Sequence, residues 1–354
     1  MSRHEDPIQL GFAEPLEADD TPASYEFDRI GGHPVWLHAM TPLPSDRRRC
    51  SACGQAMPLL LQVFTPEDCP EEAHARVLYL FACRNGNCLR DPGAVAVRAF
   101  RSQWHADPTP ATALAPPPAD APAPFPLFAL VSEDEPAEDA AAAAQDLALQ
   151  MKGVVVADGD APGVDESEET GVGVDPTFLA FQARIEREPQ QAFRYVRTRY
   201  TEADVGLDMS EDDAGADSED EDEAAESKND QAPKSLSSNA RALFACDVGK
   251  PDPASLVCRY CAGPQDLECQ VMPQILRHIQ ADHSDAAAMD FGTLLVYTCR
   301  ANCQPTTATV PEADSAMPTV AGSDKLAYME ERMVLQPFSL DGMSLANPGP
   351  QFKA

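Results

Sequence analysis

Eight of the eleven cysteines fall into two quartets with the spacing of metal ligands, and this pattern constrains the fold of the 354-residue chain more than any other feature. In the first quartet, Cys50 and Cys53 form a C-x2-C pair that is followed by Gly54, and Cys83 and Cys88 form a C-x4-C pair. A C-x2-C turn directs two thiolates at one point, and glycine lets the backbone approach the sulfurs. We therefore expect these four thiolates to hold a tetrahedral Zn2+.

The second quartet repeats this arrangement. Cys258 and Cys261 form a C-x2-C pair, and Cys299 and Cys303 form a C-x3-C pair. Because four protein sulfurs leave no open coordination position, up to two zinc ions are expected and both should be structural. Two alternatives remain open, namely buried thiols without metal and a single zinc that is shared or lost. Three further cysteines stand outside the quartets and are expected to be core or surface thiols: Cys69, Cys246 and Cys269.

Short apolar runs stand between the cysteine pairs. Residues 59–64, 77–81 and 293–297 are rich in Leu, Val and aromatic residues and are bounded by turn residues, which is typical of buried strands. Gln62 and Gln270 each stand nine residues after the last cysteine of a C-x2-C pair. We therefore expect a mainly β (α+β) fold with two pseudo-symmetric zinc-knuckle β halves that arose by internal duplication.

Most of the formal net charge of −32 resides in two segments. Residues 106–175 contain 15 Asp and Glu and one Lys, and residues 201–235 contain 14 Asp and Glu and two Lys. Because like charges repel and proline lacks a backbone donor, both tracts are expected to be disordered, with a short helix over residues 140–151. The tracts are either solvated linkers or segments that attract a basic partner segment electrostatically.

Residues 176–200 carry a net charge of +3 between these tracts. Asp175 is a suitable N-cap, and Pro176 is suited to the first helical position. We expect a helix there and a second short helix that starts at Glu188. The arginines of this piece are expected to lie mostly in solvent: Arg184, Arg187, Arg194, Arg197 and Arg199.

The chain accordingly divides into a tail (1–25), an amino-terminal zinc-knuckle β half (26–105), a disordered linker (106–175), a helical piece of a carboxy-terminal module (176–200), a disordered acidic insert (201–235), a carboxy-terminal zinc-knuckle β half (236–345) and a second tail (346–354).

Charge, apolar runs and motifs exclude several classes of protein. Contacts to phosphates need clustered Lys and Arg, so no direct binding of nucleic acid is expected. No apolar run approaches the roughly 18 residues of a membrane span, and the first residues lack the apolar core of a signal peptide. We expect a cytoplasmic monomer that shuttles to the nucleus. No phosphate-binding, zinc-protease or serine-hydrolase motif is present, so we expect no catalytic residues and no enzyme.

Motifs along the length of the chain resemble those of one known family. Residues 31–37 read G-G-H-P-V-W-L, which resembles the G-G-x-P-x-W-L opening of the programmed cell death protein 2 family. Further motifs follow in the family's order: residues 50–54, 59–64, 78–83, 101–103, 178–195, 258–261, 268–274 and 292–303, then Tyr328, Glu331 and Gln336. The match is to the shorter branch without an inserted MYND finger. It departs from the family at Ala262, where glycine is expected.

The resemblance implies a dedicated chaperone in ribosome production. Members of the family capture one newly made small-subunit ribosomal protein, the eukaryotic relative of bacterial ribosomal protein five, and deliver it for pre-40S assembly and rRNA maturation. Such a client carries a basic Arg/Gly-rich segment, which an acidic partner would screen from RNA. The strand edges near residues 59–64 and 270–272 are candidates for pairing with an added client strand.

Two other classes remain as alternatives. A zinc-ribbon nucleic-acid-binding or transcription cofactor would need a basic patch, and only the arginines of residues 184–199 offer one. An enzyme with a thiol site that has no sequence motif is the other alternative.

Overall fold

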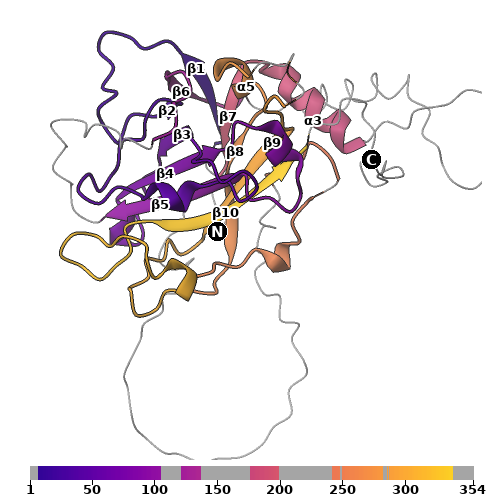
Figure 1. Cartoon of the computed structure of the whole chain (residues 1–354). Helices are drawn as coiled ribbons and strands as arrows, with labels where there is room; N and C mark the ends of the chain where they lie inside the picture. The colour runs from indigo at the N-terminus through magenta and orange to yellow at the C-terminus, as the bar shows by residue number, and fades with distance from the viewer. Residues whose placement is uncertain are drawn as a thin grey trace, which may run out of the picture.

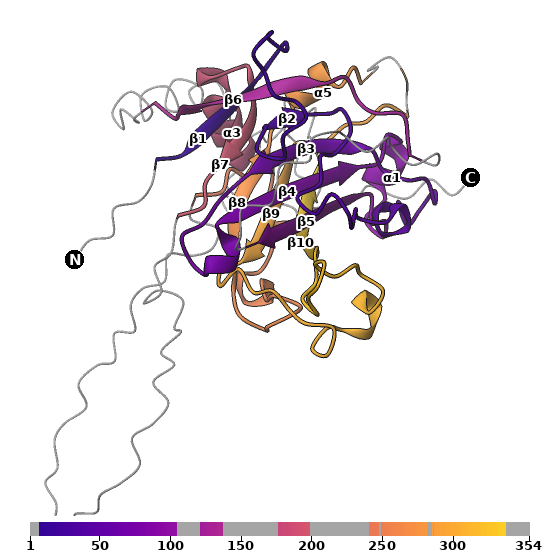
Figure 2. The same cartoon turned by 90° about the vertical axis from the view of Figure 1, so that its left-hand side faces the viewer.

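The apolar runs predicted as buried strands form the wall of a closed antiparallel barrel. Residues 59–64 become β3, residues 77–81 lie within β4, and residues 293–297 lie within β9. The structure is a computed structural model. Residues 7–104, 121–136, 176–198, 241–247, 249–281, 285 and 287–337 are described. Within them, ten strands follow one another around the barrel in the order β1-β6-β2-β3-β4-β5-β10-β9-β8-β7, and β7 pairs again with β1 (Figures 1 and 2).

The strands are β1 (Gln9–Glu14), β2 (Arg29–Ile30), β3 (Leu59–Phe64), β4 (Ala75–Ala82), β5 (Val97–Trp104), β6 (Phe128–Asp134), β7 (Gln191–Tyr195), β8 (Gln265–Val271), β9 (Thr293–Cys299) and β10 (Met329–Gln336).

Helices are few and short in this part of the chain. The α-helices are α1 (Gly86–Arg90), α3 (Pro176–Arg187) and α5 (Ile275–His278), and the 3-10 turns are η1 (Ser45–Arg48), η2 (Glu71–Ala73), η3 (Pro253–Ser255) and η4 (Glu312–Asp314). α3 begins at the predicted proline. Among the described residues, no helix combines the length and apolar character of a membrane span. The mainly β class is therefore confirmed.

One hydrophobic core joins the two predicted halves. Every residue of β4, β8 and β9 is buried, and β4 and β9 read as the nearly continuous apolar runs of strands that are covered on both faces. The largest cluster of buried side chains includes Tyr79 and Phe100 from the first half and Val271 and Tyr328 from the second. The two halves therefore share one interior.

The predicted tail over residues 1–25 contains a strand of the barrel, β1. This strand lies between β6 and β7 and closes the barrel. The close approach depends on Gly11, where an added Cβ would lie 2.8 Å from Leu130 Cδ1 and 2.9 Å from Phe193 Cβ. The local sequence indicates the strand weakly, because only two of its six residues are large and apolar.

The prediction that residues 106–175 form only a disordered linker is wrong at β6. This strand pairs with both β1 and β2, and Ala129 and Leu130 are buried. Its partners are distant in sequence, so proline content and charge do not reveal the pairing. The predicted helix over residues 140–151 and the acidic insert over residues 201–235 lie outside the described residues.

The second short helix predicted from Glu188 is also wrong. A turn follows α3, and residues 191–195 form β7, which pairs with β1 on one side and β8 on the other. Pairing on both edges outweighs the local helical preference of this segment. Arg194 and Arg197 belong to the group predicted to lie mostly in solvent, but both are buried, and the carboxylates of Glu135 and Glu67 accept their hydrogen bonds.

The candidate edges for an added client strand, near residues 59–64 and 270–272, are occupied by neighbouring strands. β3 is paired with β2 and β4, and β8 is paired with β7 and β9. Because the barrel closes through these strands, an added strand would have to displace a native neighbour. The family-motif residues Glu331 and Gln336 lie on β10.

Asp28 makes the stability of the barrel pH-dependent where β2 begins. Its Oδ1 accepts the backbone N–H of Phe64 at 2.6 Å, and burial raises the pKa of Asp28 from 3.8 to about 7. Between these values the folded chain binds the proton more tightly than the unfolded chain. The free energy of unfolding therefore falls as pH rises through this window.

We predict that Asp28→Asn removes this pH dependence and raises the free energy of unfolding at pH 8 by on the order of 1–2 kcal/mol. The asparagine amide oxygen still accepts the N–H of Phe64 but carries no charge. Urea unfolding at pH 5 and pH 8 measures the effect. A variant whose stability keeps the slope of the parent chain would show that Asp28 does not cause it.

Candidate metal centres

The first predicted quartet forms a compact cluster, the first tetrad. Cys50 and Cys53 lie in the turn after η1, Cys83 follows β4 directly, and Cys88 lies in α1. Their sulfurs all lie within 4.8 Å of one another, and the Sγ atoms of Cys53 and Cys83 are 3.7 Å apart.

The second predicted quartet forms an equivalent cluster, the second tetrad. Cys258 and Cys261 follow η3, Cys299 ends β9, and Cys303 lies in the loop after it. The Sγ atoms of Cys258 and Cys303 are 3.6 Å apart, as are those of Cys261 and Cys299. The sequence-predicted ligands are thus brought together as two separate groups of four.

The sulfur separations fit a tetrahedral metal ion. A Zn–S bond of about 2.3 Å places two ligating sulfurs about 3.8 Å apart, whereas a disulfide joins them at about 2.05 Å. The observed separations of 3.6–3.7 Å agree with the first value. Each tetrad could therefore hold one metal ion. The cysteines outside the tetrads are buried: Cys69, Cys246 and Cys269.

Backbone amides point at the first sulfur of each turn. Burial raises the pKa of Cys50, but hydrogen bonds from the backbone N–H groups of Cys53 and Ala52 outweigh it, so the pKa lies below its usual value. In the second tetrad, hydrogen bonds from the Cys258 and Cys303 side chains lower the pKa of Cys299. Burial raises the pKa of Cys83, and the hydrogen bond with Cys299 raises that of Cys258, so the metal-free electrostatics favour the thiolate, the form that binds metal, at Cys50 and Cys299 but not at every ligand.

The glycine missing from the second turn is replaced by a strained alanine. Ala262 has φ of 59°, close to the 71° of Gly54 at the same place in the first turn. Residues with a Cβ adopt this left-handed conformation at a cost of roughly 1–2 kcal/mol. The turn geometry is therefore kept although the glycine is not.

We predict that Ala262→Gly raises the free energy of unfolding by about 1 kcal/mol, because it removes this strain. Gly54→Ala is the matched control and should lower it by a similar amount, since no atom lies within 4 Å of the added Cβ to obscure the backbone effect. Urea denaturation of the metal-loaded chains measures both. Opposite signs support the account, and a stabilising Gly54→Ala contradicts it.

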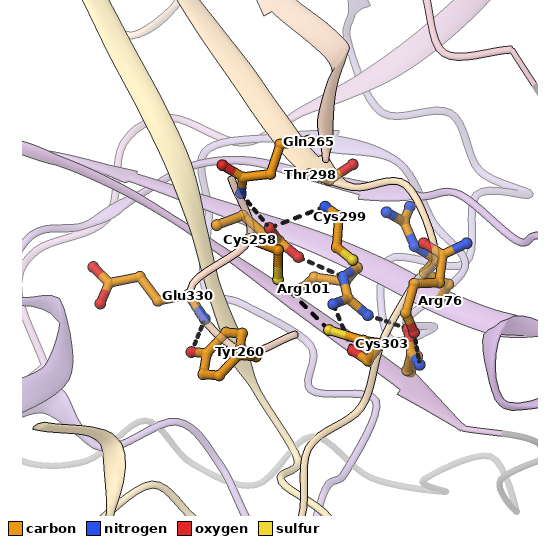
Figure 3. A network of polar contacts seen from close by, with 12 residues as sticks. Arg76, Arg101, Cys258, Tyr260, Gln265, Thr298, Cys299, Cys303 and Glu330 are labelled. Carbon is orange, nitrogen blue, oxygen red and sulfur yellow. Dashed lines mark hydrogen bonds and ion pairs between the residues drawn. The ribbon is translucent and has the colours of Figure 1, made fainter. Parts of the chain in front are cut away.

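Buried charges hold the second tetrad from inside the barrel. Arg101 on β5 donates to the carbonyl of Cys303 at 2.8 Å and to Glu331 Oε1 at 2.6 Å (Figure 3). Glu331 in turn accepts the backbone N–H of Cys299 at 3.3 Å. Arg197 donates to the carbonyl of Cys299 at 3.3 Å. The loop from Cys299 to Cys303 is therefore positioned by side chains of both halves.

A second buried group of charges lies beside the first. Arg76 on β4 binds both carboxylate oxygens of Glu268 on β8, at 2.5 and 2.6 Å, and both side chains are fully buried. Arg197 binds Glu67 at 2.6 Å and lies 3.7 Å from Glu268. Burial raises the pKa of Glu268, but the charge of Arg76 outweighs it and lowers the pKa to about 2.

This network was not predicted from the sequence, although β4 contains a signal of it. Arg76 interrupts an otherwise apolar strand, and a lone charge in such a strand indicates a buried partner, whereas β8 around Glu268 contains several other polar residues and gives no such signal. The partner could not be identified, because 192 residues separate the two.

A third contact joins the two tetrads near the surface. Glu330 on β10 accepts hydrogen bonds from Arg98 and from Arg259, the latter at 3.0 Å. Arg98 also donates to the carbonyl of Arg49, next to Cys50, at 3.4 Å. Arg259 lies between the two cysteines of the second turn. The same carboxylate thus contacts the second cysteine turn directly through Arg259 and the first turn indirectly through Arg98.

Comparison with known proteins identifies the family. The family model for the N-terminal domain of programmed cell death protein 2 matches residues 7–109, and the model for its C-terminal domain matches residues 175–320. Each matched part contains one tetrad. The chain belongs to the programmed cell death protein 2 family. The resemblance noted from the sequence motifs is thereby confirmed, and the buried pair of Arg76 and Glu268 joins the two family domains.

Relatives within the programmed cell death protein 2 family match the chain to different extents. Programmed cell death protein 2 of Rattus norvegicus is 24% identical over 84% of this chain and 92% of the relative. The Mus musculus protein of that name is 35% identical, but over only 27% of each chain. A Schizosaccharomyces pombe protein named "Probable 20S rRNA accumulation protein 4" is 32% identical over 28% of this chain and 24% of that protein. No solved structure matches the chain.

Proposed function

We propose that this protein escorts a newly made, basic small-subunit ribosomal protein during ribosome biogenesis. The observation that carries the proposal is its membership in a family with a relative named for 20S rRNA accumulation. The charge supports it, because a chain with net charge −32 attracts basic segments and repels RNA. The client is the eukaryotic relative of bacterial ribosomal protein five, with its Arg/Gly-rich segment.

The arginines weigh against a nucleic-acid-binding cofactor. That function needs exposed basic side chains between residues 184 and 199. Arg184 and Arg194 instead share the carboxylate of Glu135, at 2.7 and 3.0 Å, and Arg197 is buried with Glu67. Charges used in internal ion pairs are not available to phosphates. Arg184, Arg194 and Arg197 therefore support a protein client over an RNA ligand, and Arg187 alone among the described arginines of this segment is exposed.

Zinc has a structural role on this proposal. Each tetrad binds one Zn2+ through four thiolates, which leaves no coordination position for water or substrate. Each ion links the ends of strands that are far apart in the sequence. We accordingly propose a binding function without enzymatic activity. The protein acts as a monomer in the cytoplasm and accompanies its client toward the nucleus.

We also propose that the two halves are pseudo-symmetric through duplication with an exchange of strands. Strands β2 to β5 correspond to β7 to β10 in order around the barrel. The β3–β4 and β8–β9 pairs each contain a register shift, and Gln62 and Gln270 after these shifts both bind backbone groups of a preceding segment. The first strand of each half, β1 or β6, pairs with the second strand of the other half.

Capture of the client during its translation tests the function. A tagged chain is expressed in cells, ribosome-bound nascent chains are recovered, and the bound ribosomal proteins are identified. We expect one basic small-subunit protein to be enriched. Deletion of residues 201–235, which removes a net charge of −12, should weaken capture and its dependence on salt. If no ribosomal protein is captured by the full chain, the proposed function is wrong.

A further inference from the structure

Among the described residues, the barrel leaves a strand edge open at the end of β6. β2 pairs with β6 only through Arg29 and Ile30, opposite Ala129 and Phe128, and the N–H of Leu130 donates to the carbonyl of Asp28 at 3.0 Å. Beyond Leu130, no strand among the described residues pairs with this side of β6. The last four residues of β6 are exposed on the surface: Val131, Ser132, Glu133 and Asp134.

The register identifies the backbone groups on the open side. The N–H of Glu135 donates to the carbonyl of Ile8 on the β1 side, so odd-numbered residues of β6 turn their backbone groups to β1. Backbone direction alternates along an antiparallel strand. Ser132 and Asp134 therefore turn their N–H and C=O groups away from β1, in the same direction as Leu130.

The hydrogen-bonded ladder between β2 and β6 stops at Leu130 because the chain before β2 turns away from β6. The residue that would face Ser132 in the register of β2 is Glu26, but its N–H donates to Ser24 Oγ at 3.1 Å. Arg29 fixes this turn, because its guanidinium donates to the carbonyls of Pro22 at 2.7 Å and Ser24 at 3.0 Å. The open edge of β6 is therefore a consequence of the turn that precedes β2.

The charge beside this edge is negative. Glu133 and Glu26 are exposed, and Asp134 accepts a hydrogen bond from Gln9. The nearest arginines across the strands are engaged, since Arg184 and Arg194 both bind Glu135. Exposed sheet edges pair readily with extended chains, and like charges prevent pairing with an identical edge. The edge therefore disfavours a second copy of this chain and favours a basic strand.

We propose that the open edge of β6, residues 131–134, binds an extended basic segment as an added strand. Main-chain hydrogen bonds to Ser132 and Asp134 would hold the segment, and its basic side chains would lie beside Glu133 and Glu26. This inference rests on the proposed function, since the segment belongs to the basic client protein. Figure 2 shows that β1 and β6 run side by side, so the new strand would extend the β1–β6 pair outward.

Amide hydrogen exchange of the full chain tests the site directly. The probe is a synthetic nine-residue peptide of alternating arginine and threonine. We expect the amides of Ser132 and Asp134 to exchange at least about tenfold more slowly when the peptide is bound, because they become donors to it. The amides of Val131 and Glu133 already face β1 and should not change. Absence of binding, or binding without this alternating protection, overturns the proposal.

Two variants test the same site by affinity. Ser132→Pro removes an N–H that faces away from β1, and Glu133→Lys reverses a charge at the edge. Each should weaken peptide binding at least about tenfold, whereas Glu71→Lys on η2, also exposed, should bind as the parent chain does. If Ser132→Pro fails to fold, Glu133→Lys and the exchange pattern still decide. Unchanged affinity in Glu133→Lys overturns the proposal.

Other occupants of the edge give different results. Slow exchange of Ser132 and Asp134 in the free protein would indicate a segment of the same chain, and exchange that slows with protein concentration would indicate a second copy. Either result overturns the proposal. Capture of the ribosomal client by Glu133→Lys at the level of the parent chain would reject this site but keep the proposed function. Failure of the parent chain to capture any client rejects the function itself.

Discussion

Removal of metal from the two tetrads is expected to unfold the barrel. Structural zinc contributes roughly 10–16 kcal/mol to folding, which equals or exceeds the roughly 5–15 kcal/mol by which native proteins are stable. Without the ion, four thiols at 3.6–3.7 Å separations have no ligand bond to hold the strand ends together. A strong chelator should abolish the native circular dichroism spectrum at 25 °C, and added Zn2+ should restore it.

Cysteine variants distinguish the tetrads from the other thiols. Cys53→Ser and Cys261→Ser should each reduce the metal content from two ions to one and lower the thermal midpoint strongly. Cys269→Ala is the control, because Cys269 is buried in β8 outside both tetrads. It should retain two ions, as measured by elemental analysis. Fewer than one ion per molecule in well-folded parent protein, or equal thermal stability with and without metal, would contradict the proposed metal role.

Breaking the buried pair of Arg76 and Glu268 is expected to have the second largest effect. Arg76→Met leaves the Glu268 carboxylate in the barrel interior with less compensation, and removal of one partner of a buried pair costs roughly 3–5 kcal/mol. Both side chains have no exposed surface, so water cannot replace the lost partner. Urea unfolding at pH 7 measures the loss. A decrease below about 1 kcal/mol would contradict this account.

The contribution of the same pair to the free energy of unfolding is expected to decrease at acid pH. The pKa of Glu268 is lowered from 4.5 to about 2, so its contribution to stability is present above 4.5 and is lost as pH falls toward 2. Glu268→Gln should therefore flatten the stability profile in this acid range. Glu72→Gln is the matched control, since the Glu72 and Lys325 side chains are 31% and 35% exposed. Its effect should be no more than about 1 kcal/mol.

The eight ligands could be predicted from sequence because a cysteine turn is a local feature. Two cysteines separated by two residues approach one another in any turn that permits it, and the apolar strands beside them are recognised by composition. The strands around Tyr79 and Val296 were therefore expected, whereas β1, β6 and β7 were not. Each of these three strands depends on neighbours supplied by distant parts of the chain.

The sequence by itself determined the twin cysteine groups, the mainly β character, the concentration of negative charge and the family. Only the tertiary structure decided that strands of both halves interleave in one barrel, that Arg76 and Arg197 are buried with carboxylates, and that β6 keeps an open edge. The physical reason is the distance along the sequence over which each interaction acts. Turn geometry and apolar runs act between neighbouring residues, whereas strand order and charge pairing depend on which distant segments exclude water together.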